Sequence, residues 1–166
     1  MKRLLLLVLT PLFLVLATTL PAQAVSPHFI SASGGLNANG SLTVNFKEAG
    51  LGTNQNITYV LSADATATYV CVNRGGANPS ASNKTTVSGP VSATGTFSSG
   101  KNGNVVGSLT VQPPPTSLTC PGGQTLRLAS VSYTNVTLTD TTNGITASIP
   151  GTFDSGCLLP NVRGAC

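Results

Sequence analysis

Apolar and polar residues alternate strictly from Ser41 to Phe46, which places Leu42, Val44 and Phe46 on one side of the backbone and the polar residues on the other. Because successive side chains of a β-strand point to opposite faces, this pattern predicts a strand with one buried and one solvated face.

Similar stretches rich in Val, Thr, Ile and Tyr recur along the chain, and such residues favour strands. They are Ile57 to Leu61, Thr66 to Val72, Thr85 to Phe97, Val105 to Val111, Leu126 to Leu138 and Ile145 to Phe153. Gly, Pro and Asn separate them, and Asn143-Gly144 is typical of a tight hairpin because both residues tolerate a positive φ.

After residue 24, no segment of ten or more residues shows the 3.6-residue apolar period of a helix. The sequence therefore predicts an all-β fold, an antiparallel Greek-key β-sandwich of the immunoglobulin-like class with seven to nine strands and two disulfides, with a barrel as the alternative. A true antibody-type domain is disfavoured, because the chain has no Trp and Tyr69 precedes the first cysteine rather than the second.

The first 24 residues have the pattern of an export signal. Two cations, Lys2 and Arg3, precede an apolar run that ends at Leu16, and Ala22-Gln23-Ala24 offers a cleavage site. The run is shorter than the ~20 residues that a transmembrane helix needs, and Pro11 interrupts it. We expect residues 1–24 to be cleaved and residues 25–166 to form one secreted domain without a membrane span.

Cys71, Cys120, Cys157 and Cys166 are an even set in a chain predicted to be exported, so disulfides are expected. Closure of the short loop between Cys157 and Cys166 favours that pair and leaves Cys71 for Cys120, although two other pairings are possible. Zinc ligation would need closely spaced Cys or His residues, and a catalytic Cys would need a base, whereas the chain has one His.

Charge is sparse, with 7% of residues charged. Of eight Lys and Arg residues, Lys2 and Arg3 belong to the leader, and the others stand singly along the chain against four acids. Nucleic acids and anionic membranes are bound by clustered cations, so neither partner is expected.

The sequence offers few residues for catalysis or metal binding. His28 follows Pro27, which has no amide proton to lose, so an amino-terminal copper site is not expected. Glu48 beside Lys47 has the pattern of a solvated pair in a turn, and Asp140 and Asp154 stand at turn edges where Asp accepts hydrogen bonds from backbone amides. We therefore expect no catalytic residue, no cofactor and no metal site, and no enzyme activity.

The stretch from Asn73 to Lys84 is the most distinctive predicted loop. It links a strand that carries a cysteine to the next strand, and long loops on rigid sandwiches often carry recognition. Arg74, Asn78 and Lys84 are its candidate interaction residues. An ordinary polar connection with a Gly-Gly turn is the alternative.

Two resemblances bear on function. With "FKEAGLG" and "CVNRGGANPSASNK", the chain resembles small exported all-β proteins of Gram-positive bacteria of unassigned function. The turn "GLGT" before a Cys-bearing strand is similar to the apoproteins of enediyne chromoproteins, which implies a carrier of a small apolar ligand. We expect a secreted interaction or structural module that binds an extracellular or cell-surface molecule or itself, with the carrier and, after it, a hydrolase as alternatives.

Overall fold

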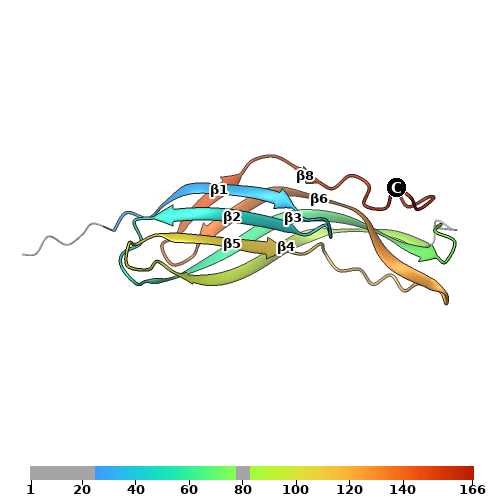
Figure 1. The fold of residues 1–166 in the computed structure, drawn as a ribbon, viewed down its shortest axis with the longest axis horizontal. Helices are drawn as coiled ribbons and strands as arrows, with labels where there is room; N and C mark the ends of the chain where they lie inside the picture. The colour runs from blue at the N-terminus through green and yellow to red at the C-terminus, as the bar shows by residue number, and fades with distance from the viewer. Residues whose placement is uncertain (1–24, 78–82) are drawn as a thin grey trace, which may run out of the picture.

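The computed structural model describes residues 25–77 and 83–166, and every regular element in them is a β-strand (Figure 1). The predicted leader, residues 1–24, and the candidate residue Asn78 lie outside the described residues. The strands are β1 (His28–Leu36), β2 (Leu42–Ala49), β3 (Asn56–Asn73), β4 (Lys84–Ser98), β5 (Val105–Val111), β6 (Gln124–Asp140), β7 (Ile145–Ile149) and β8 (Phe153–Asp154).

The strands form two antiparallel sheets, so the predicted β-sandwich is confirmed. One sheet has the order β1-β2-β5, and the other has the order β4-β3-β6-β7, with β8 paired to β6. The chain passes between the sheets from β2 to β3, from β4 to β5 and from β5 to β6, which interleaves the hairpins in a Greek key.

Alternating side chains of the two sheets fill the space between them. Phe46 of β2, Tyr59 of β3 and Phe97 of β4 form its aromatic centre, with the Phe46 and Tyr59 rings 4.5 Å apart. Gly107 of β5 lies against these rings, and a Cβ atom there would stand 2.8 Å from Phe46 and 2.9 Å from Phe97. A side chain at this position would therefore force the rings apart.

Two of the predicted strands form one continuous strand in the structure. Ile57 to Leu61 and Thr66 to Val72 both belong to β3, because Ala63, Ala65 and Ala67 continue the inward-facing positions between them. Burial of these small side chains outweighs the weak strand preference of Ala. Conversely, the stretch from Ile145 to Phe153 divides into β7 and β8.

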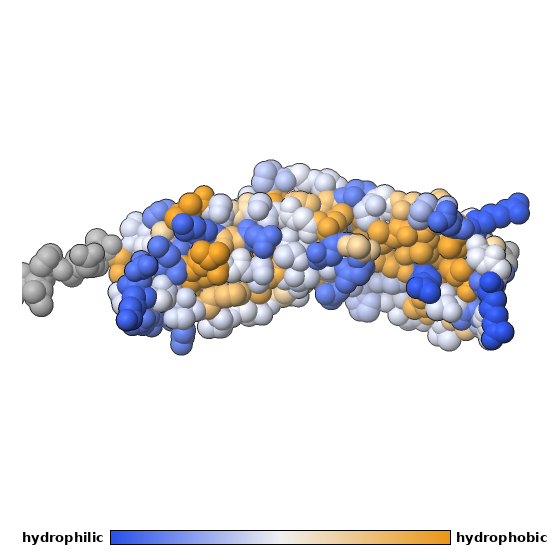
Figure 2. Space-filling view, in the orientation of Figure 1, coloured by the Kyte–Doolittle hydropathy of each residue, from blue (hydrophilic) through white to orange (hydrophobic). Residues whose placement is uncertain are grey.

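The strands of the larger sheet extend beyond the smaller sheet at one end, on the right in Figure 1. There the inner face of β3 is covered by residues 112–123, which have no regular secondary structure. The Tyr69 hydroxyl donates to the Pro114 carbonyl at 2.9 Å, and Cys71 forms a disulfide with Cys120. Figure 2 shows an apolar area at this end. Leu126, which lies opposite Cys71 in the β3–β6 pair, is 38% exposed.

No helix among the described residues has the length and apolar character needed to cross a membrane.

Candidate functional site

Both disulfides support the end at which the large sheet protrudes. The pairs are Cys71–Cys120 and Cys157–Cys166, as the loop-closure argument predicted, and the described residues include no free cysteine. Cys71 is fully buried on the inner face of β3, so it ties residues 112–123 to the sheet.

The second disulfide closes residues 157–166 into a loop on the outer face of the same sheet. We call residues 155–166 the tail knob. Its Ala165 is fully buried against Val70 of β3 and Ala129 of β6, and Leu159 and Val162 pack around them. Val70 faces outward because β3 alternates, with Tyr69 and Cys71 on the inner face.

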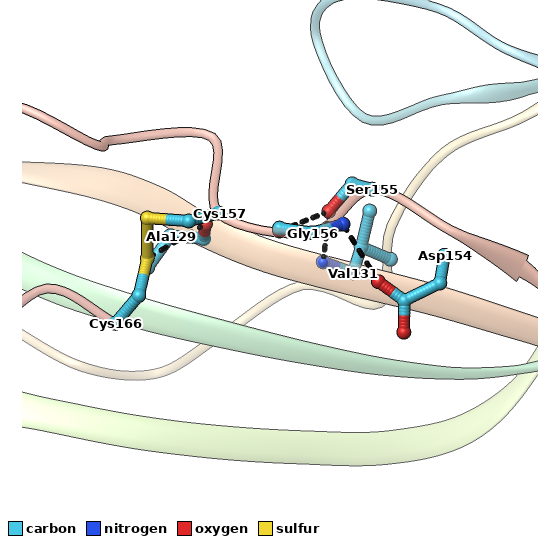
Figure 3. Close-up of a disulfide and its surroundings, with 7 residues drawn as sticks. All are labelled: Ala129, Val131, Asp154, Ser155, Gly156, Cys157 and Cys166. Atoms are coloured by element: carbon cyan, nitrogen blue, oxygen red, sulfur yellow. Dashed lines mark hydrogen bonds between the residues drawn. A yellow bond between two sulfur atoms is a disulfide. The ribbon is translucent and has the colours of Figure 1, made fainter.

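Hydrogen bonds attach the start of the knob to β6, as Figure 3 shows for Ser155. The Ser155 hydroxyl accepts from the Val131 amide at 2.9 Å, and the Leu158 amide donates to the Ala129 carbonyl at 2.7 Å. The register between β3 and β6 shifts here, because Ala129 is an extra residue in β6. Such a bulge bends the strand locally.

Four cations surround the tail knob. Val70 lies directly opposite Lys84 of β4 on one side and Arg127 of β6 on the other, so all three side chains share the outer face. Two strand spacings, about 10 Å, separate Lys84 from Arg127. Arg163, on the knob, is held by a bridge to Ala77 and by its amide, which donates to the Gly76 carbonyl at 3.3 Å.

The fourth cation, Arg74, stands in the turn that follows β3. The Asn73 side chain fixes this turn by accepting from the Ala77 amide at 3.0 Å, and Gly76 adopts the positive φ of 71° that the turn requires. We call Arg74, Lys84, Arg127 and Arg163 the basic end. All four are exposed, and within residues 25–77 and 83–166 none of them forms an ion pair.

The structure gathers cations that are scattered in the sequence. The cations stand singly in the sequence, but strand pairing and the second disulfide bring four of them to one end. Of the sequence-predicted interaction residues, Arg74 and Lys84 lie there. Arg127 and Arg163 were missed, since only the register of β6 on β3 and the path of the tail reveal them.

The opposite end buries two acids. Glu48 and Asp140 are both fully buried, so the prediction that Glu48 is a solvated partner of Lys47 in a turn is wrong. The reason is the alternation of β2, which continues past Phe46 and turns residue 48 inward. Asp140 does accept the Thr142 and Asn143 amides at 2.8 and 3.0 Å, as the turn-edge prediction required.

Glu48 has an unusual electrostatic environment. Neither of its carboxyl oxygens nor the Tyr59 hydroxyl makes a hydrogen bond of ordinary geometry within the described part of the chain. Burial raises the pKa of Glu48 to about 7, the nearby Tyr59 hydroxyl lowers it in part, and Asp140 adds to the rise. Burial, assisted by Glu48, also raises the pKa of Tyr59. A substrate in solution does not reach these groups.

Metal ligands do not gather in the part of the chain that the structure describes, where no group of three or more His, Cys, Asp or Glu side chains is suitably placed. His28 is exposed, and its Nδ1 lies 2.8 Å from the Ser26 carbonyl oxygen.

The chain matches no protein-family model and no curated protein.

Proposed function

We propose that this protein is an exported, non-enzymatic interaction module of immunoglobulin-like type that contacts an acidic partner through the basic end. The observation that carries the proposal is the convergence of four unpaired cations on a frame supported by both disulfides. Like charges brought together repel one another, which favours their pairing with an external anionic surface.

The rigidity of this frame suits recognition. Lys84 and Arg127 belong to paired strands, Arg74 to a hydrogen-bonded turn and Arg163 to a disulfide-closed knob. Because the backbone at each cation is already fixed, less conformational entropy is lost on binding. Disulfides persist in oxidising compartments, which supports export.

The acids support a non-enzymatic role. Glu48 and Asp140 lie together but sealed in the core, and Asp154 accepts the Gly156 amide at 2.6 Å. The space between the sheets is filled by core side chains, so the apolar carrier has no observation in its favour and stays a prediction, as does the hydrolase.

A matched pair of variants tests the proposal. Lys84→Gln/Arg127→Gln removes two cations from the basic end, and Lys47→Gln/Lys101→Gln removes two exposed cations elsewhere, with the same change in net charge. Retention on immobilised heparin, used as a defined polyanion, is measured as the salt concentration at elution. We expect a substantial fall for the first variant and a small one for the second. Equal falls would show that net charge, rather than the basic end, governs retention.

A further inference from the structure

Beside the tail knob, the outer face of the large sheet is hollowed. Two adjoining depressions of about 350 and 210 Å³ share Thr66 and Ser132. Together they form what we call the hydroxyl hollow, whose principal residues are Asp64, Thr66, Thr68, Ser130, Ser132 and Asp154. The knob forms one wall of it through Gly156, Cys157 and Cys166.

The hydroxyl hollow carries negative charge. Asp64 and Asp154 are both exposed in it, and neither Lys nor Arg lines it. One oxygen of each is used internally, since Asn135 Nδ2 donates to Asp64 Oδ2 at 2.8 Å and the Gly156 amide donates to Asp154 Oδ1. The second oxygen of each carboxylate has no partner within residues 25–77 and 83–166, and Figure 3 shows one Asp154 oxygen on the Gly156 amide and the other oxygen without a dashed line.

Two hydroxyl groups of the floor, those of Thr66 and Thr68, are already paired with hydroxyl groups of β4. The Thr66 hydroxyl lies 2.9 Å from that of Ser88, and the Thr68 hydroxyl lies 3.1 Å from that of Thr86. Covering a polar group costs free energy chiefly when it loses its hydrogen-bond partner. These cross-strand pairs keep their partners, so a protein surface can cover Thr66 and Thr68 at low cost.

The hollow and the basic end lie side by side on one face. Asp64 and Val70 are six residues apart on β3, about 20 Å along the strand, and Lys84, Arg127 and Arg163 surround Val70. A face that carries a raised basic knob next to an acidic hollow complements its own copy. A two-fold axis lying across the strands between the two features would place each knob over the other hollow, and such an interface closes on itself.

The available area is sufficient for a dimer. From Thr58 to Val70 the outer face is about 40 Å long. It is about 14 Å wide over β4, β3 and β6, and β7 and β8 widen it by a fourth strand only beside residues 132–140 of β6. The area is on the order of 600–700 Å² for each partner, which is at the lower end of the range for specific interfaces.

We infer that a second copy of this chain occupies the hydroxyl hollow, so that Asp64 and Asp154 of one protomer face Lys84, Arg127 and Arg163 of the other in a two-fold dimer. The inference rests on the proposed function, because it names the acidic partner that the basic end contacts. The buried parts are polar and charged, so the dimer weakens as salt screens the charges.

Charge reversal tests this dimer by sedimentation equilibrium at low ionic strength. Asp64→Lys/Asp154→Lys gives a protomer with two basic features, and Lys84→Glu/Arg127→Glu gives one with two acidic features. We expect each variant alone to have a dimer dissociation constant raised at least about tenfold. An equimolar mixture should form heterodimers, because each feature then meets its opposite. Lys47→Glu/Lys101→Glu, remote from this face, should dimerise like the unmodified protein.

A monomeric unmodified protein at low salt, or a mixture that stays as unassociated as its components, would overturn the inference. Thermal melting of each variant checks that it is folded. The heparin experiment separates the two proposals: retention through the basic end by a monomeric protein refutes the dimer alone, whereas loss of both results refutes the proposed function as well.

Discussion

The two ends of the sandwich handle charge in opposite ways. At one end, Glu48 and Asp140 are fully buried beneath the aromatic centre, and the pKa of Glu48 rises to about 7. At the other, Arg74, Lys84, Arg127 and Arg163 stand in solvent around the tail knob. At the first end burial favours the neutral form of Glu48, whereas the second end keeps its charges exposed and unpaired.

The difference follows from what covers the inner face of the large sheet. Over Tyr59 the smaller sheet lies on it, and a carboxyl group there is shut away from water. Over Tyr69 the cover is the irregular segment 112–123, held by Cys71–Cys120. Both disulfides therefore lie at the end that we propose for binding, whereas packing and hydrogen bonds organise the other end.

The largest effect is expected from removing the disulfide Cys71–Cys120. The chain-entropy relation gives a loss of about 4 kcal/mol for its sequence separation of 49 and about 2.6 kcal/mol for the separation of 9 in Cys157–Cys166. Urea denaturation of the two Cys→Ala double variants measures both losses. Similar losses would show that the two disulfides constrain the unfolded chain equally.

The same variants also show how much the tail knob contributes to binding. Loss of Cys157–Cys166 should lower retention on heparin more than its smaller cost in stability suggests, because Arg163 leaves the basic end when the knob opens. Unchanged retention in that variant would contradict the place given to Arg163.

A smaller effect is expected at the other end, from Glu48. Its pKa in the folded protein, about 7, lies above its ordinary value of 4.5, so the folded state holds the proton to higher pH than the unfolded state does. The stabilising contribution is complete below pH 4.5, falls as the pH rises toward 7 and is lost above it. The loss is on the order of 3 kcal/mol.

Glu48→Gln, which is uncharged at every pH, is the control. The difference in unfolding free energy between the unmodified protein and this variant should be small at pH 4 and should grow in favour of the variant up to pH 8. A difference that stays constant over this range would show that Glu48 is ionised in the folded protein.

Much of the fold was predictable because alternation and turns are local signals. The bounds of β5, Val105–Val111, agree with the prediction, since the strand is short and flanked by Gly and Pro. Burial of Glu48 could also be predicted from the sequence, because residue 48 continues the inward-facing series of Leu42, Val44 and Phe46. The usual exposure of Glu conflicts here with the period of the strand, and the period prevails.

The basic end depends on information that local patterns do not contain. Arg127 meets Lys84 only through the register of β3 with two neighbours, and that register shifts at two bulges in β6, near Ala129 and near Asn135. Asn135 has a positive φ of 52°, which Asn tolerates, but many Asn residues in this chain do not form bulges. The sequence therefore predicts the sheets more closely than it predicts the surface they build.

The smallest expected effect on stability comes from the hydrogen bond between β3 and residues 112–123. Tyr69→Phe removes the hydroxyl that donates to the buried Pro114 carbonyl, which should cost about 1 kcal/mol of unfolding free energy. If Cys71–Cys120 is what keeps residues 112–123 on the sheet, this hydrogen bond is already lost when that disulfide is removed. Tyr69→Phe should then cost less than half as much in the Cys71→Ala/Cys120→Ala background as in the unmodified protein, which a double-mutant cycle measures directly. An undiminished cost would show that packing of the segment, rather than the disulfide, holds it in place, and the contrast between the two ends would disappear.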